Sequence, residues 1–428
     1  MRATKDSGVE WLGDVPQIWE TSPLRTLMSL RNERNTAYRS DNYLSLMANV
    51  GIIPYAEKGD VGNKAPEDLG KCKIVSEGDF VLNSMNFGIG SFGVSAYNGI
   101  CSSVYVVMEP RLEKVVPSFL KYIFSMQPFQ KHVQSLGNGI LEHRAGIGWD
   151  ELKNMGFPMP DLDEQRRIAV FLDRETAKID ALIAKQEQLV ATLGERLQGE
   201  ISKSVLQGLE TDADLKDSGI SWMGQIVSSW TVSRIGRHYD LTLGKMLNEQ
   251  SQTEGVTLPY VRAGSIQENG LDFENIKTMS FSSSEVKNYQ ILPGDVLVVE
   301  GGSIGRSIYL PEGLPNWGFQ NHVIRLRALR NQFPGFVDFY IKHLKAIGHF
   351  DRLSAFATIP NLSADKLSKI EMPVLPFSQQ VAIFEHLSEE TRLVKEFQRK
   401  ADAAVELLHE RRQAIISAAV TGKISVGA

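Results

Sequence analysis

The chain has 428 residues, of which 42% are apolar and 23% are charged, and its formal net charge is −5. These proportions are close to the globular average, so they exclude a wholly disordered chain, and the length predicts two to four domains. A net negative charge by itself argues against a protein coated in positive charge for nucleic acid.

The beginning of the chain shows no export signal, because no apolar stretch follows its charged residues. No run approaches the roughly 18 apolar residues that a membrane-spanning helix needs. The two cysteines, Cys72 and Cys101, are too few for a disulfide framework or a structural zinc site. We therefore expect a cytoplasmic protein that does not bind a membrane.

The chain contains an internal repeat. The segment SGVEWLG at residues 7–13 recurs as SGISWMG at 218–224, which is 211 residues later. Further on the offset becomes 215, as in the pairs Pro158 and Pro373, and Val205 and Val420. A period above 200 residues is too long for a solenoid and indicates a duplicated domain.

The first part of each copy, residues 1–160 and 218–375, has mixed secondary-structure signals. Short strand-like runs alternate with turns that contain Gly, Pro, Asn and Asp. The predicted strands are 80–82, 104–108, 296–299 and 323–326, and the predicted helices include 118–129 and 336–347. We predict an α+β domain in each copy.

The second part of each copy, residues 161–209 and 376–428, has a seven-residue hydrophobic repeat, which is typical of a coiled coil. Each helix would be about 40 residues and about 60 Å long, and such a narrow apolar seam needs a partner helix. The heptads predict a seam at Ile168, Leu172, Ile179, Leu182, Leu189, Leu193, Ile383, Leu387, Val394, Phe397 and Leu408.

The obvious partner of each long helix is its repeat. The heptads do not fix the direction, but a pseudo-twofold molecule favours an antiparallel coiled coil. Glu175, Glu390, Arg196 and Arg411 fall on seam positions, where they would either form interhelical pairs or lie in solvent. Residues 210–217 are acidic and polar and are predicted to be an exposed linker.

Catalytic motifs are nearly absent. Residues 88–93 spell G-x-G-x-x-G, but the following residues 94–99 resemble a strand and a turn. A dinucleotide site requires a helix there, so structural glycines in a hairpin are the better interpretation. There is no phosphate-binding loop, no zinc-protease motif and no adenine-methyltransferase motif, and the eight histidines are dispersed. We predict neither a catalytic nor a metal site.

Several stretches resemble the DNA specificity subunit of type I restriction–modification systems. The resemblance extends over nearly the whole chain and includes the duplication. The stretches are residues 7–13 with Pro16 and Trp19, 294–297 with 302–305, 361–363 running to Pro373, 164–168, and the closing TGKI at 421–424.

This resemblance implies that each mixed domain is a target recognition domain for one half of a split sequence in double-stranded DNA. The long helices would be spacers that set the gap between the half-sites. Partners would be two modification subunits, with S-adenosylmethionine, and restriction subunits, with ATP and magnesium. The chain itself would be a non-catalytic subunit.

The resemblance does not name the base-contacting residues, so we select them by chemistry. Arg, Lys, Asn, Gln and His in loops read base edges or hold phosphates, although each is otherwise an ordinary surface residue. The selected residues are Arg31, Arg34, Asn83, Asn86, His143 and Arg144 in the first domain, and Lys245, Arg262, Arg306, Gln320, Asn321 and His322 in the second.

Two other functions remain open. One is a coiled-coil scaffold that binds no DNA, and the other is a cryptic nucleotide-binding enzyme that uses residues 88–93. The charge does not exclude DNA, because residues 1–160 carry 16 basic and 17 acidic side chains and residues 218–375 carry 15 and 14. Near-neutral domains permit a basic face, and we expect the chain alone to bind DNA poorly.

Overall fold

The computed structural model describes residues 3–48, 50–60, 64–85, 90–136, 147–246, 255–268, 270–354 and 361–427. The chain forms two compact units. Unit 1 comprises Met1–Gln186 with Asp402–Ala428, and unit 2 comprises Glu187–Ala401. Each unit therefore contains one mixed domain and about half of each long helix.

Unit 1 is built on an antiparallel sheet. The sheet has the strand order β4-β11-β8-β9, formed by Met28–Arg31, Tyr105–Pro110, Phe80–Asn83 and Phe92–Val94. Helices α2 (Pro117–Phe124) and α3 (Gln127–Leu136) contribute aromatic side chains to the core beside it. Two of them, Phe124 and Phe129, lie 4.8 Å apart between ring centroids.

Unit 2 repeats this sheet in the same order. The strands are β16, β24, β21 and β22, formed by Tyr239–Leu243, Val323–Ala328, Asp295–Val299 and Ser307–Leu310. Helix α7 (Pro334–Ala346) takes the place of α2, and both helices begin with a proline. The predicted strands at 80–82, 104–108, 296–299 and 323–326 and the predicted duplication are therefore confirmed.

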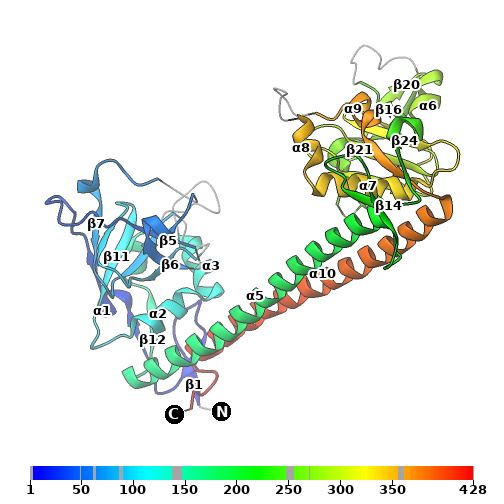
Figure 1. Ribbon diagram of the computed structural model, residues 1–428. Helices are drawn as coiled ribbons and strands as arrows, with labels where there is room; N and C mark the ends of the chain where they lie inside the picture. The colour runs from blue at the N-terminus through cyan, green and yellow to red at the C-terminus, as the bar shows by residue number, and fades with distance from the viewer. Residues whose placement is uncertain are drawn as a thin grey trace. The chain divides into compact units, whose positions relative to one another are not determined.

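The two long helices are α5 (Leu162–Gln207) and α10 (Phe377–Val420), with 46 and 44 residues. They lie side by side and run in opposite directions within each unit (Figure 1). In unit 1, Arg412 Nε donates to Asp180 Oδ1 at 2.9 Å, and in unit 2 His386 Nε2 lies 3.1 Å from Glu200 Oε1. The predicted antiparallel pairing is thus confirmed.

The buried seam of α5 differs from the heptad prediction after Ile179. Ile168, Leu172 and Ile179 are buried, but Leu182 and Leu189 are 48% and 44% exposed, and Ile183 is buried instead. The buried positions 168, 172, 176, 179 and 183 average about 3.75 residues per step, so the contact stripe leaves the 3.5-residue register. An α-helix without supercoiling has about 3.6 residues per turn, so its contact stripe also departs from a heptad register.

The remaining predicted seam positions lie closer to expectation. Ile383 and Leu387 are buried, whereas Leu193, Val394, Phe397 and Leu408 are half-buried. The carboxylate of Glu175 bonds Arg174 and Lys178 of its own helix.

A buried glutamine attaches each mixed domain to its long helix. In unit 1, Gln165 accepts a hydrogen bond from Val116 N at 2.8 Å and donates to Pro160 O. In unit 2, its counterpart Gln380 accepts from Phe333 N at 2.9 Å. Each accepted bond satisfies a backbone donor just before α2 or α7, so the start of that helix is fixed to the spacer helix.

A glycine with positive φ ends each long helix, and the two differ in their surroundings. Gly422 and Gly208 have φ values of +71° and +72°. A Cβ at Gly422 would overlap the Pro16 ring, whereas a Cβ at Gly208 would lie 3.5 Å from Trp230. Both glycines end the helix in the left-handed conformation that favours glycine.

We therefore expect Gly422→Ala to destabilise the protein more than Gly208→Ala. Gly208→Ala adds mainly the left-handed backbone cost of about 1–2 kcal/mol, while Gly422→Ala adds steric overlap and should cost roughly 3 kcal/mol or more. Thermal unfolding of the two variants checks this order. Equal losses would show that Pro16 yields without cost.

In the part of the chain that the structure describes, no helix has the length and apolar character required to cross a membrane.

Candidate nucleic-acid interface

The strand ends of the unit 2 sheet meet at one edge, which we call the loop edge. Strand β16 ends at Leu243 and pairs with Ile324, β21 ends at Val299 and pairs with Val323, and β22 begins at Ser307. The loop edge consists of the segments that leave these ends, namely residues 244–246, 261–267, 300–306, 320–322 and 361–362.

Backbone hydrogen bonds bring the predicted residues together at the loop edge. Lys245 N donates to Phe319 O, and Asn321 N donates to Lys245 O, each at 3.0 Å. Gln320 N donates to Val261 O at 2.9 Å, which places Arg262 beside this cluster. Residues that are far apart in the sequence therefore lie close together at the loop edge.

Lys245 is an internal anchor at this edge. Its buried ammonium donates to Ser280 O at 2.7 Å and to Glu285 Oε2 at 2.6 Å. The hydrogen bond from Lys245 lowers the pKa of Glu285, which also caps α6 (Ser283–Tyr289) through Ser282 N. Lys245 therefore holds its loop on α6.

The two predicted arginines are partly used by the protein itself. Arg306 Nη1 donates to Ile266 O at 2.9 Å, and Arg262 Nη2 donates to Asn275 O at 3.0 Å. The Nε atoms of both are buried and have no hydrogen-bond partner within the described residues. These arginines therefore fix the loops of the loop edge.

The segment Gln320, Asn321 and His322 is the most accessible predicted group. Gln320 and Asn321 are half-buried, and the side chain of His322 is 56% exposed, with Nδ1 3.7 Å from Glu300 Oε2. Burial raises the pKa of Glu300, and the nearby His322 opposes that rise. Amide and imidazole groups of this kind match the donors and acceptors of base edges.

Unit 1 presents the corresponding edge, at the ends of β4 and β8 and the starts of β11 and β9. Asn83 is buried, and its Oδ1 accepts from Met85 N at 3.1 Å. Arg34 is exposed. The predicted Asn86, His143 and Arg144 lie outside the described residues.

Arg31 belongs to the sheet itself. Its Nε lies 2.7 Å from the buried Asp79 Oδ2, and its Nη2 lies 3.2 Å from Glu109. The Asp79 carboxylate raises the pKa of Arg31, while burial raises the pKa of Asp79. Arg31 therefore holds strands of the sheet together through these two carboxylates.

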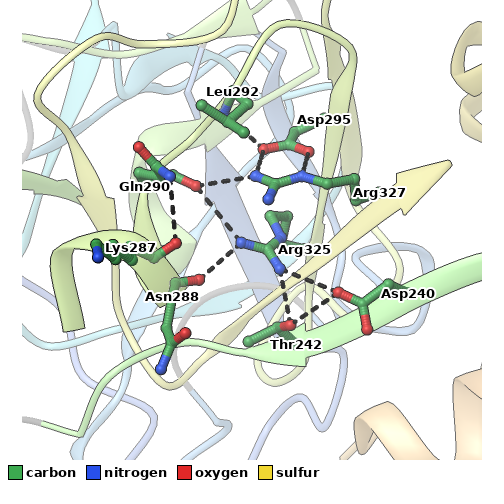
Figure 2. A network of polar contacts seen from close by, with 9 residues as sticks. All are labelled: Asp240, Thr242, Lys287, Asn288, Gln290, Leu292, Asp295, Arg325 and Arg327. Atoms are coloured by element: carbon green, nitrogen blue, oxygen red, sulfur yellow. Dashed lines mark hydrogen bonds and ion pairs between the residues drawn. The ribbon is translucent and has the colours of Figure 1, made fainter. Parts of the chain in front are cut away.

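In unit 2 the buried carboxylate of the sheet pairs with an arginine from a different strand, and this arginine is not among the residues predicted from the sequence. Figure 2 shows Arg327 bonded through two nitrogens to the buried Asp295, the counterpart of Asp79. Arg325 donates to Asn288 O, Asp240 and Thr242. The sequence did contain one signal for these buried pairs, namely two arginines in the otherwise apolar strand VIRLRA at residues 323–328.

Across the described ranges, no group of three or more His, Cys, Asp and Glu side chains is placed to hold a metal ion. After residues 88–89, which lie outside those ranges, the chain continues as strand β9, as predicted for a glycine-containing hairpin.

The duplicated fold matches a known family. The model of the type I restriction modification DNA specificity domain matches residues 16–191 and again 228–406. The chain belongs to this family. It is a specificity subunit with two target recognition domains, one in each unit.

Relatives align with this specificity subunit over nearly their full length. The putative type I restriction enzyme MjaX specificity subunit of Methanocaldococcus jannaschii is 21% identical, covering 97% of this chain and 96% of the relative. The StySPI specificity subunit of Salmonella potsdam is 22% identical, covering 96% and 90%.

Solved structures share the fold. A chain from work on complex assembly and conformational transition of the type I R-M system has a TM-score of 0.72 at 16% identity, covering 96% of this chain and 99% of that one. The HsdS subunit of Thermoanaerobacter tengcongensis has a TM-score of 0.55 at 17% identity, covering 96% and 98%.

Proposed function

We propose that this specificity subunit recognises a two-part sequence in double-stranded DNA, one half with each target recognition domain. Residues 1–160 and 218–375 are the recognition domains, residues 161–209 and 376–428 are the spacer helices, and residues 210–217 link the copies. The observation that carries the proposal is the loop edge of unit 2 together with the corresponding edge of unit 1. Both lie at the same strand ends of a sheet with the same strand order.

The side chains at the loop edge suit this role. In unit 2, Lys245 anchors a loop from inside, and Arg262 and Arg306 fix the neighbouring loops. Beside them, Asn321 is half-buried and His322 is exposed, and these two residues offer an amide and an imidazole group. Anchored loops with a few accessible polar side chains reduce the entropy that binding costs, which favours specific recognition.

The proposed partners supply the chemistry. Two modification subunits would methylate adenine with S-adenosylmethionine, and restriction subunits would use ATP and magnesium for translocation and cleavage. The specificity subunit then directs these activities to the target. Its own surface contributes sequence reading and spacing.

Co-expression with the methyltransferase subunits, followed by methylation mapping at base resolution, tests the proposal. We expect methylated sites to share two short constant parts separated by a gap of constant length. The double variant Asn321→Ala/His322→Ala should relax or lose only one constant part, since each good base contact contributes about 1–3 kcal/mol.

The matched control is Arg399→Ala, an exposed residue of α10, which should leave the methylated sequence unchanged. Methylation of an uninterrupted sequence would contradict the two-part target. Loss of both constant parts in the double variant, with the protein folded, would contradict the assignment of one half to each domain.

A further inference from the structure

Unit 2 contains a groove between α7 and the two long helices. Its volume is about 760 Å³, and four cations line it, namely Arg306, Lys342, Lys345 and Lys395. Only two carboxylates, Glu195 and Glu268, are among the lining residues. We call this the basic groove.

Unit 1 contains the corresponding groove with the opposite charge balance. Its volume is about 780 Å³, and its lining has the cations Lys121 and Arg412 against the carboxylates Asp173, Asp180 and Glu410. The 215-residue offset aligns Asp180 with Lys395 and Thr176 with Thr391. The duplication has therefore kept the size of the groove and reversed its charge.

Several polar groups that line the groove of unit 1 form hydrogen bonds within that unit. Tyr122 Oη donates to Asp173 Oδ1 at 2.6 Å and lies 3.3 Å from Thr176 Oγ1, which donates to Leu172 O at 2.7 Å. Asp180 is bonded to Arg412 at 2.9 Å. Asp173, Thr176 and Asp180 therefore already have partners within unit 1.

The basic groove lacks the hydrogen bonds that Tyr122 makes in unit 1. Phe339 occupies the position of Tyr122, five residues after the helix-starting proline, and supplies no hydroxyl. The buried Thr391 Oγ1 has no hydrogen-bond partner within the described residues, and the same holds for Arg306 Nε. Two polar atoms of the lining thus remain unpaired.

The lysines of the basic groove are only partly neutralised. Lys342 lies 2.6 Å from Asp338 and Lys345 lies 3.7 Å from Glu268, while Lys395 Nζ donates to the backbone oxygen of Glu268 at 3.3 Å. Burial lowers the pKa of Lys395, and the positive charge of Lys342 lowers it further. A bound anion would relieve this repulsion between like charges.

We propose that the basic groove binds backbone phosphates of double-stranded DNA, beside the half-site that unit 2 reads and without a counterpart in unit 1. This inference rests on the proposed DNA-binding function. Arg306 belongs both to the loop edge and to the basic groove, so the two surfaces are continuous. Lysines bind phosphates as point charges and carry no sequence information.

The test uses the specificity subunit in complex with its methyltransferase partners. We expect the triple variant Lys342→Gln/Lys345→Gln/Lys395→Gln to lower the slope of log affinity against log salt by two to three, at about 0.9 per lost phosphate contact. The loss of affinity for target DNA should grow by about a hundredfold to a thousandfold as the salt concentration falls from 1 M to 0.1 M. The methylated sequence should not change, because base contacts remain.

The matched control is Lys203→Gln/Lys216→Gln/Lys400→Gln, which removes three exposed positive charges outside the basic groove. If both triple variants give the same salt slope, the basic groove is not a phosphate site, although sequence-specific binding by the unaltered complex would still support the proposed function. If the unaltered complex binds no DNA, the proposed function itself fails.

A second measurement needs no variant. Ethylation of individual phosphates should interfere with binding beside the unit 2 half-site, at positions that have no equivalent beside the other half-site. Equal interference on both sides would overturn the asymmetry. Inorganic phosphate that competes fully at millimolar concentration would indicate a site for free anions in place of the DNA backbone.

Discussion

Asp295→Ala is expected to lower the free energy of unfolding of unit 2 by about 3–5 kcal/mol, because it breaks a buried charge pair from one side. The Asp295 carboxylate is fully buried and accepts from Arg327 Nε at 2.8 Å, Arg327 Nη2 at 2.7 Å and Leu292 N at 2.7 Å (Figure 2). Its removal leaves a guanidinium and a backbone donor without that partner.

Hydrogen exchange of amides in β21 and β24 measures this effect where it occurs. The matched control is Asp365→Ala, which removes an exposed pair with Lys369 and should cost no more than about 1 kcal/mol. The double variant Asp295→Leu/Arg327→Met should recover much of the loss, since it leaves no unpaired charge. A loss of under 1 kcal/mol for Asp295→Ala would show that the pair is not an anchor.

The second large effect concerns the spacer helices. A seven-residue insertion after Leu182 in α5, matched by seven residues after His409 in α10, would lengthen both helices by about 10.5 Å. That length corresponds to about three base pairs at 3.4 Å each. We expect methylation at the original sites to fall by at least a hundredfold and new sites with a longer gap to appear.

The paired insertion respects the observed contacts. Asp180 lies opposite Arg412, so position 182 of α5 and position 409 of α10 are neighbours across the pair. A heptad turns an α-helix by two turns less about 20°, which preserves the buried stripe. The same insertion in α5 alone is the control, and it should destabilise the pair. An unchanged gap in the methylated sites would refute the role of the helices as a ruler.

Side-chain availability at the candidate site could not be predicted. By chemistry, Arg31 and Lys245 are candidate DNA contacts, yet their partners Asp79 and Glu285 lie 48 and 40 residues further along the chain. No sequence pattern links residues at such distances. The clustering of Lys245, Gln320, Asn321 and His322 likewise depends on strand register.

By itself, the sequence determined the duplication, the α+β class, the central strands and the two long helices, because these follow from periodicity and from local turn residues. Only the tertiary structure decided that Ile183 replaces Leu182 in the buried stripe, since a straight helix departs from the heptad. It alone also decided which cations are internal anchors, as for Arg327 on Asp295, and which line an open groove, as for Lys395. A charge near the surface is neutralised or available according to its neighbours in space, and packing sets those neighbours.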